Sequence, residues 1–489
     1  MQDDKNISEI KIEDQKIIDN KELSMLEAMI PVVILMGLLA YNIFFVEGQE
    51  WFGGYTNQYI LLIGGGVTAI VGFLNKVSLK RMITEVWENW KSVFVPIMIL
   101  FLVGALAGTW LVSGVIPAMV YYGLQVLSPA IFLPASVIIA AIISIATGSS
   151  WTTSATVGIA LIGIGGALGI PTGMIAGAVI SGAYFGDKMS PLSDTTNLAP
   201  AMAGTDLFTH IKYMAYTTVP TIVITLIVFS ILSTTIDTSG SADVSGLLTT
   251  IDATFNISPW LFLVPGAVIA MILMKTKPLI ALGIGVILAG IFALIFQSNV
   301  LSALSDSNFS AVITSVFTDT QIQTTDAKLT ELFSAGGMKG MLWTIFLIVC
   351  AMVFGGIMDA IGALAKITKA LLSLASSVFG LFASTVVSCL GLNVIASDQY
   401  LALVIPGKMF KKAYEDRGLA PENLSRTLED SGTVTSVLIP WNTCGAYQSG
   451  VLGVGVGEYF MYAIFNWLSP FTTLLFAAFN IKIRQLVKK

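Results

Sequence analysis

The chain has 489 residues, of which 55% are hydrophobic and only 11% are charged, and its mean hydropathy is +0.83. Because a soluble domain carries about 25% charged residues, this composition excludes an ordinary soluble protein and predicts an all-α polytopic membrane protein. The net charge of −5 offers no basic surface, so we expect no nucleic-acid partner. Three separated cysteines and one histidine provide neither a disulfide framework nor a histidine-based metal site.

The chain divides into a polar tail and three apolar regions. Residues 1–24 carry mixed charge and lack the pattern of a secretory signal, so we expect a short cytoplasmic tail. We expect an N-terminal transmembrane half over 25–234, linking helices and outer loops over 235–340, and a C-terminal transmembrane half over 341–489.

A helix that spans the bilayer needs about 20 apolar residues. Twelve segments qualify: 28–46, 58–74, 93–112, 129–147, 153–169, 213–234, 259–274, 279–297, 341–360, 370–391, 394–410 and 459–480. Two further segments, 172–205 and 420–457, are apolar but interrupted by polar residues. The sequence therefore predicts roughly 12–14 crossings.

The positions of lysine and arginine orient these crossings, since cytoplasmic loops carry an excess of both. Residues 75–91 contain four such residues, and 411–417 ("KKAYEDR") and the C-terminal end are also basic. Residues 47–57 and 235–257 contain none. The simplest arrangement places both termini in the cytoplasm.

Two stretches in opposite halves share a pattern. Residues 181–220 and 431–470 each begin with Ser-Gly, carry a polar patch around a proline, and then reach an acidic residue that introduces a helix. The positive-inside pattern starts helix 213–234 in the cytoplasm and ends helix 459–480 there. Equivalent segments therefore run in opposite directions, which predicts two inverted repeats, as in many secondary transporters.

Four polar interruptions could carry the chemistry. They are "TGSSWTTSAT" (147–156), "GDKMSPLSDTTN" (186–197), "GLNVIASDQY" (391–400) and "PWNTCGAYQSG" (440–450). Irregular or re-entrant backbone at membrane depth is tolerated where it lines a site, and a hard cation such as Na⁺ prefers oxygen ligands. The candidate ion-binding and proton-exchange residues are Ser149, Ser150, Thr152, Asp187, Asp194, Thr195, Thr196, Asn197, Asn393, Ser397, Asp398, Asn442 and Thr443.

Each candidate has an alternative structural role. Serine and threonine in membrane helices often bond only to the backbone or to a neighbouring helix. Asp187 could cap a helix or pair with Lys188, and Asp194 could be a helix N-cap. Glu429 and Asp430 could pair with Arg426. A second set of candidates, for gating or pH sensing, is Asp359, Glu429, Asp430 and His210, although a capping or surface role is the alternative for His210.

Enzymatic motifs are missing from the sequence. It contains no HExxH, no GxSxG and no GxxxxGK[ST] nucleotide loop. We therefore expect a protein that is not an enzyme and uses no cofactor apart from transported ions.

The longest motifs resemble the NhaC family of Na⁺/H⁺ antiporters, within the broader ion-transporter superfamily. They are "TGSSWTTSATVGIALIGIG", "GAVISGAYFGDKMSPLSDTTNLAPAMAGTDLFTHIKYM", "SDQYLALVIPGKMF" and "EDSGTVTSVLIPWNTCGAYQSGVLGV". The resemblance implies a bacterial inner-membrane protein that exchanges cytoplasmic Na⁺ for external H⁺. It also leaves open a homodimer, and sodium- and proton-coupled transport of a small organic acid (malate/lactate exchange) or of an amino acid.

A carboxylate that is removed from water can hold either a proton or a sodium ion at working pH. If only the occupied site crosses the membrane, the two ions compete and their exchange is obligatory. We expect Asp187 and Asp194 to be the exchanging pair, with Asp398 as their partner in the second half. In the alternative, half-helix N-termini would hold the carboxylate of an organic substrate.

Overall fold

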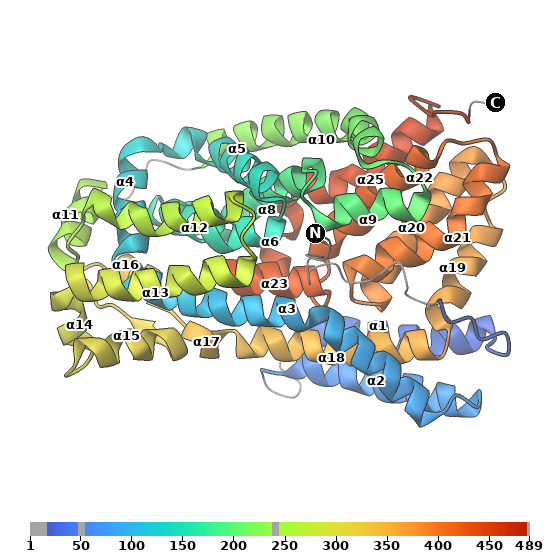
Figure 1. The fold of residues 1–489 in the computed structure, drawn as a ribbon, viewed down its shortest axis with the longest axis horizontal. Coiled ribbons are helices and arrows are strands. Elements are labelled where there is room, and N and C mark those ends of the chain that lie inside the picture. The colour runs from blue at the N-terminus through green and yellow to red at the C-terminus, as the bar shows by residue number, and fades with distance from the viewer. Residues whose placement is uncertain (1–16, 47–53, 237–243, 487–489) are drawn as a thin grey trace, which may run out of the picture.

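The computed structural model describes residues 17–46, 54–236 and 244–486. Residues 1–16 of the predicted tail lie outside this range. Within it, the only strands are the two-residue pair β1 (Thr320–Gln321) and β2 (Ser334–Ala335), and helices make up most of the remainder (Figure 1). The predicted all-α class is confirmed.

The helices before the first polar interruption are α1 (Met25–Phe45), α2 (Thr56–Leu74), α3 (Leu79–Val112), α4 (Val115–Val126) and α5 (Pro129–Thr147). Helix α3 begins 14 residues before the predicted start at residue 93, because Ser78 caps it by accepting a hydrogen bond from the Arg81 N–H at 3.3 Å. The amphipathic segment 79–92 therefore continues the apolar span as one helix.

The middle of the chain contains two 19-residue helices and a series of shorter ones, some of which form bent pairs. They are α11 (Val244–Thr254), η4 (Pro259–Phe262), α12 (Leu263–Leu273), α13 (Pro278–Phe296), α14 (Ser298–Leu304), α15 (Asn308–Phe317), α16 (Ala327–Leu332), α17 (Gly337–Gly340), α18 (Leu342–Ala360) and α19 (Ala363–Ser373).

Eight described helices are long and apolar enough to cross a membrane, and up to eleven spans result if three bent helix pairs each count as one. This identifies a multi-pass membrane protein, with fewer spans than the predicted 12–14. The difference comes from segments 153–169, 172–205, 394–410 and 420–457, whose helices are short, broken or interrupted by charged residues.

Two runs of elements repeat the same order. The first is α5, then α6 (Ser150–Thr153), η3 (Ser154–Gly158) and α7 (Ile159–Ala167), then α8 (Thr172–Met189), α9 (Asp194–Ala203) and α10 (Leu207–Thr235). The second is α20 (Val378–Ile395), α21 (Gln399–Asp416), then α22 (Pro421–Leu428), η5 (Glu429–Thr433) and η6 (Ser436–Leu438), then α23 (Thr443–Leu452), followed by α24 (Val456–Tyr459), η7 (Phe460–Tyr462) and α25 (Ile464–Ala478).

The breaks in the two runs use the same local chemistry. Ser193 caps α9 and Asn442 caps α23, each with a side-chain oxygen that accepts a backbone N–H. Gly204 and Gly453 end these two helices with φ of 90° and 68°, the left-handed conformation that glycine adopts without strain. The short helices α9 and α23 are therefore equivalent.

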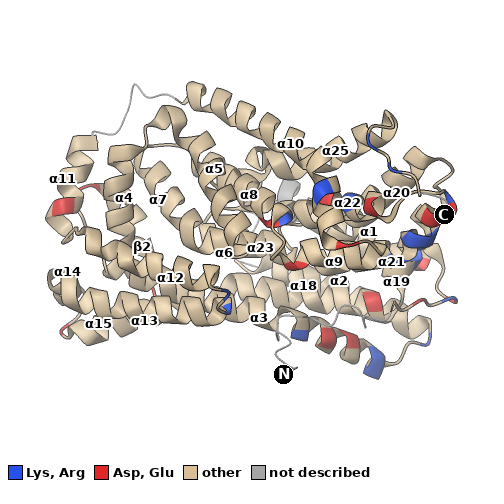
Figure 2. Ribbon diagram, turned by 45° about the horizontal axis from the view of Figure 1, so that its top comes forward, with Lys and Arg blue, Asp and Glu red and all other residues tan. Residues whose placement is uncertain are grey.

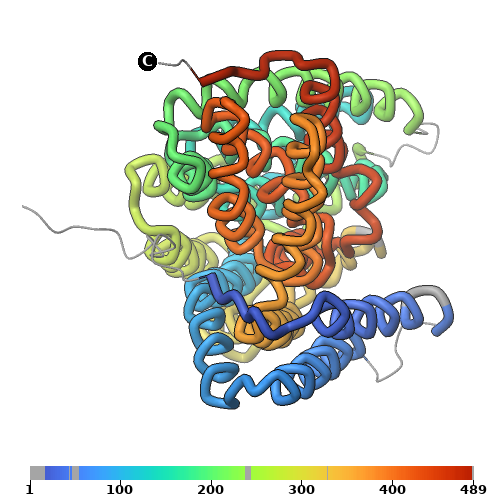
Figure 3. Tube along the Cα trace, turned by 90° about the vertical axis from the view of Figure 1, so that its right-hand side faces the viewer, coloured from blue at the N-terminus to red at the C-terminus, as the bar shows by residue number. Residues whose placement is uncertain are grey.

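Contacts that involve the helices preceding each run come in matched pairs, as a two-fold exchange of the halves requires. Helix α2 packs against α18, and α13 packs against α3; likewise, α4 contacts α7 while α19 contacts α21. Helices α10 and α25, which are equivalent, pack against each other. In Figure 3 the green segments around α9 and α10 lie beside the orange and red segments of the second run. This exchange agrees with the predicted inverted repeats.

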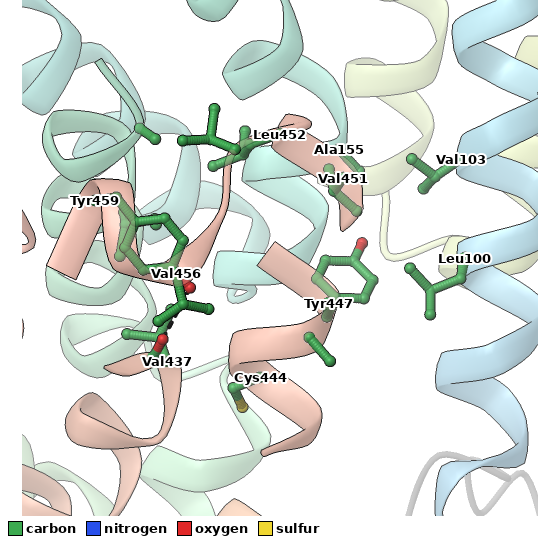
Figure 4. Close-up of a cluster of buried hydrophobic side chains, with 14 of the residues drawn as sticks. Leu100, Val103, Ala155, Val437, Cys444, Tyr447, Val451, Leu452, Val456 and Tyr459 are labelled. Carbon is green, nitrogen blue, oxygen red and sulfur yellow. Dashed lines mark hydrogen bonds between the residues drawn. The ribbon is translucent and has the colours of Figure 1, made fainter. Parts of the chain in front are cut away.

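A hydrophobic cluster encloses α23 at the centre of the molecule. Figure 4 shows Tyr447 of α23 facing Leu100 and Val103 of α3, with Cys444 of α23 farther from α3 and Tyr459 on the other side. The Tyr459 hydroxyl donates to the Val437 carbonyl at 2.9 Å, so the buried ring is also satisfied by a hydrogen bond. Helix α23 is thus fixed between the two halves.

Helix α8 approaches α5 through a glycine. A Cβ at Gly182 would lie 2.2 Å from the Val137 carbonyl oxygen, too close for any larger side chain. Small residues at membrane helix contacts allow two backbones to approach this closely. We expect Gly182→Ala to lower the free energy of unfolding by about 1–3 kcal/mol through overpacking. Thermal unfolding in detergent measures this, with Gly283→Ala in α13 as the control, because a Cβ there meets nothing within 4 Å. Equal melting temperatures would contradict the close approach.

Candidate ion-transport site

The first polar station forms where α6 begins. Asp187, near the end of α8, points its Oδ2 at Ser150, which donates its backbone N–H at 3.0 Å and its hydroxyl at 2.7 Å. The positive N-terminal end of a helix favours a carboxylate in this position. Asp187 is 7% exposed, and its Oδ1 has no hydrogen-bond partner among the described residues. One carboxylate oxygen is therefore left for another ligand.

Two further candidates, Ser149 and Thr152, lie on either side of Ser150 in the chain and belong to the same station. The Ser149 hydroxyl caps α6 by accepting from the Thr152 N–H at 3.2 Å. Ser150 and Thr152 are buried, whereas Ser149 is half-buried. All three thus lie together at the break, and only Ser150 contacts Asp187 directly.

The break between α8 and α9 is held by its own polar residues. The Thr196 hydroxyl donates to the carbonyls of Asp187 and Lys188 at 3.3 and 3.1 Å. Asn197 donates to the Ser193 carbonyl at 2.6 Å, and Thr195 lies 3.2 Å from the Ser193 hydroxyl. Of these three residues, Thr196 contacts Asp187 directly, while Thr195 and Asn197 make bonds within the loop between α8 and α9.

Asp194 differs from Asp187 in its surroundings. It is exposed and is the first residue of α9, so the predicted N-cap role is wrong: the cap is Ser193. One Asp194 oxygen accepts from the Thr195 N–H at 3.0 Å, and the other accepts from the Tyr400 hydroxyl. Asp194 therefore links α9 to α21 in the other half.

The second station brings together all five candidates from its half. Asp398 caps α21 by accepting from the backbone N–H groups of Tyr400 and Leu401 at 2.9 and 3.1 Å. The Asn442 amide donates to the carbonyl of Asn393 at 3.0 Å. The Thr443 N–H donates to the carbonyl of Ser397 at 2.9 Å, where Ser397 adopts a left-handed φ of 60°. Hydrogen bonds from the start of α23 thus satisfy backbone carbonyls at and just after the end of α20.

Two aromatic residues that the sequence analysis did not single out connect the stations. Trp151 stacks on Tyr447 with centroids 4.0 Å apart, and the Tyr447 hydroxyl donates to the Trp151 carbonyl at 3.1 Å. Tyr400, from the second half, donates its hydroxyl to Asp194 in the first half. Both Trp151 and Tyr400 lie two residues after a helix cap, in "SSW" and "DQY", so their equivalence could have been read from the aligned repeats.

The Tyr400 contact leads to a testable expectation. Tyr400→Phe keeps the ring and removes the hydroxyl that bonds Asp194. Because a hydrogen bond to a charged group contributes about 1.5–3 kcal/mol, we expect ion exchange to fall by about 10-fold or more while the protein stays folded. Flux measurements in proteoliposomes test this, with Tyr121→Phe in α4 as the matched control. Unchanged flux in Tyr400→Phe would show that this link has no part in transport.

A buried ion pair lies beside the first station. Lys188 pairs with Asp430 of η5, and both side chains are 0% exposed. Thr217 of α10 donates to Asp430 Oδ2 at 2.8 Å, and Thr473 of α25 donates to the same oxygen. Nothing in the local sequence indicates this pairing, because 242 positions separate the two residues.

This ion pair corrects two alternatives. Lys188 pairs with Asp430 and not with Asp187. The alternative in which Arg426 pairs with Glu429 or Asp430 is also wrong: the Arg426 guanidinium lies 4.6 Å from the centroid of the Tyr213 ring. Glu429 is fully buried, and neither of its carboxylate oxygens has a hydrogen-bond partner within the described part of the chain.

The remaining gating candidates lie apart. His210 is buried, with its Nδ1 2.8 Å from the Ser425 hydroxyl, so a surface or capping role is wrong. Asp206 caps α10 instead, and the hydrogen bonds from Thr209 hold the pKa of Asp206 below its usual range. Asp359 is buried in the last turn of α18. His210 joins α10 to α22, whereas Asp359 belongs to a different helix.

The fold and the stations together define a class of protein. Two inverted repeats with broken helices, and buried carboxylates at the breaks, are the architecture of a secondary active transporter.

Comparison with known proteins specifies the family. A model of the Na⁺/H⁺ antiporter family matches residues 182–481. The chain is 36% identical to the Na⁺/H⁺ antiporter NhaC of Alkalihalophilus pseudofirmus, over 88% of this chain and 93% of that protein. The protein therefore belongs to the Na⁺/H⁺ antiporter family, and the resemblance to NhaC is confirmed.

Other relatives have different names. The chain is 34% identical to the malate-2H⁺/Na⁺-lactate antiporter of Bacillus subtilis, over 84% of this chain and 86% of that protein. It is 35% identical to the arginine/ornithine antiporter ArcD of Halobacterium salinarum, over 78% of this chain and 77% of that protein.

Proposed function

We propose that this protein exchanges cytoplasmic Na⁺ for external H⁺ across the bacterial inner membrane, and that Asp187 carries the exchange. The observation that supports this most directly is the half-satisfied carboxylate: Ser150 bonds one buried oxygen of Asp187, and the other has no hydrogen-bond partner in the part of the chain that the structure describes. Membership of the Na⁺/H⁺ antiporter family supports Na⁺ and H⁺ as the ions that are exchanged.

The exchange follows from the cost of burying a charge. A carboxylate removed from water must be neutralised by a proton, a counter-ion or strong hydrogen bonds. Among the described residues, Ser150 donates both hydrogen bonds to Asp187 Oδ2, and Oδ1 accepts none. Na⁺ and H⁺ would therefore compete for Asp187, and a site that crosses only when occupied would couple their fluxes.

The other ligands would come from uncharged oxygens. In the described residues no group of three or more His, Cys, Asp or Glu side chains could hold a metal ion. Na⁺ accepts hydroxyl and carbonyl oxygens as ligands. In this proposal Ser149, Ser150 and Thr152 complete the site around Asp187, Asp398 and its neighbours form the equivalent station, and Asp194 with Tyr400 keeps the stations together.

The proposed orientation places both termini in the cytoplasm. Lysine and arginine are concentrated around α21, α22 and the C-terminal end, whereas most of the length of the helices contains no charged residue (Figure 2). This distribution is the one expected for a cytoplasmic face. Labelling of single cysteines introduced at residues 411–417 in sealed cells tests it: labelling from outside would reverse the orientation.

The direct test is ion exchange in proteoliposomes. We expect Na⁺ added to one side to drive H⁺ movement in the opposite direction, detected with a pH-sensitive dye. Proton movement that does not respond to Na⁺ would overturn the proposal. Size analysis of the same purified protein tests whether it forms a homodimer.

A second candidate is sodium- and proton-coupled transport of a small organic acid or amino acid. The stacked Trp151–Tyr447 pair between the stations favours it, since aromatic surface commonly lines organic-ligand sites, and two relatives are named for such substrates. Adding malate, lactate, arginine or ornithine to sodium-loaded vesicles decides between the candidates. Sodium flux that depends on one of these compounds supports the second, and sodium flux unaffected by all of them supports the first.

A further inference from the structure

The surroundings of Lys188 resemble those of a bound ion. Its Nζ is paired with Asp430 and lies 3.4 Å from the Ser469 hydroxyl. The other Asp430 oxygen accepts from Thr217 and Thr473. These four oxygen-bearing residues are buried and come from η5, α10 and α25, whereas Lys188 enters from α8. Asp430 and Ser469 contact the ammonium group directly, whereas Thr217 and Thr473 bond the other oxygen of the Asp430 carboxylate. We call these four residues, which lie between the two repeats, the cage.

The residues of this cage suit a monovalent cation. Asp430 and Ser469 supply the carboxylate and hydroxyl oxygens that a hard cation accepts as ligands, and the Thr217 and Thr473 hydroxyls lie against the same carboxylate. The cage carries a single negative charge, which one monovalent cation neutralises. An ammonium group and Na⁺ carry the same charge and both bind oxygen lone pairs, the ammonium group by donating hydrogen bonds and Na⁺ by direct coordination. The ammonium of Lys188 is in addition attached to the protein.

We propose that Asp430, Thr217, Ser469 and Thr473 form a second monovalent-cation site, in which the Lys188 ammonium is a permanent, built-in occupant. The site is distinct from the one at Asp187, and its existence does not depend on which ion the protein transports. Lys188 keeps Asp430 neutralised, so that only the neighbouring carboxylate exchanges its cation with solution.

The position of Lys188 gives the built-in cation a further consequence. Lys188 directly follows Asp187, and the Thr196 hydroxyl bonds both of their carbonyls. The Phe465 ring lies 5.9 Å from Lys188 Nζ and adds a favourable cation–π contact. Anchoring Lys188 in the cage therefore fixes the end of α8 from which Asp187 reaches Ser150.

Removing the built-in cation should open the cage to a free one. We expect purified Lys188→Met to bind one more Na⁺ per chain than the double variant Lys188→Met/Asp430→Asn, measured by equilibrium dialysis with radioactive sodium. Lys188→Arg keeps a cation in place and should bind as many Na⁺ ions as the unmodified protein. Equal Na⁺ binding by Lys188→Met and the double variant would overturn the proposal.

A second measurement covers the case in which Lys188→Met is unstable. Ligand binding to the folded state raises the melting temperature as ligand concentration increases. We expect Na⁺ or methylammonium to raise the melting temperature, or the folded yield, of Lys188→Met more than that of the double variant. Equal responses of the two variants to both cations would contradict a cation site at Asp430.

Asp187→Asn in the Lys188→Met background separates this proposal from the proposed function. We expect it to remove the Asp187 ion and to leave the ion at Asp430. If the unmodified protein binds no Na⁺ while Lys188→Met binds one, the proposed sodium site at Asp187 fails and the second site stands.

Discussion

Asp187→Asn is expected to abolish sodium-driven proton exchange while leaving the protein folded. The amide keeps the shape of the side chain and can still accept the Ser150 hydrogen bonds. It has no charge to attract Na⁺ and no proton to exchange. Loss of one charged partner costs about 3 kcal/mol, which corresponds to roughly a 100-fold loss of Na⁺ affinity. Proteoliposome flux over a range of Na⁺ concentrations measures this.

Asp194→Asn provides the matched comparison. Asp194 is exposed and already accepts from Tyr400 and from the Thr195 N–H, so its loss should weaken exchange less than the loss of Asp187. If ion flux survives in Asp187→Asn and disappears in Asp194→Asn, then Asp194 and not Asp187 carries the exchange.

Breaking the Lys188–Asp430 pair is expected to have the largest effect on stability. Both side chains are fully buried, and removing one partner leaves an uncompensated charge that costs about 3–5 kcal/mol. We expect Lys188→Met and Asp430→Asn each to lower the melting temperature strongly in sodium-free buffer, and the double variant to lower it less than either. Thermal unfolding in detergent measures all three.

An exposed ion pair serves as the control for this prediction. Lys412 and Asp416 on α21 lie 3.1 Å apart, with side chains 82% and 62% exposed. Exposed pairs contribute at most about 1 kcal/mol, so Lys412→Met should leave the melting temperature nearly unchanged. Equal effects of Lys188→Met and Lys412→Met would contradict the structural importance of the buried pair.

The inverted repeats show how far local sequence signals reach. Ser149 and Asp398 precede equivalent helices, and Ser193 and Asn442 precede another equivalent pair. These caps fall inside the four polar stretches, because a serine, aspartate or asparagine oxygen satisfies the free N–H groups of a new helix. The positions of the breaks were therefore predictable, although α3 and the number of spans were not.

The membrane class, the family, most of the helices and the polar breaks were all predictable from the amino-acid sequence, since they depend on residues adjacent along the chain. Three features required the folded structure: Lys188 pairs with Asp430, Tyr400 bonds Asp194, and Asp187 is buried while Asp194 is exposed. These contacts join residues 206 to 242 positions apart. Helical periodicity specifies which face of a helix a residue occupies, but the choice of the facing helix depends on how the two repeats pack.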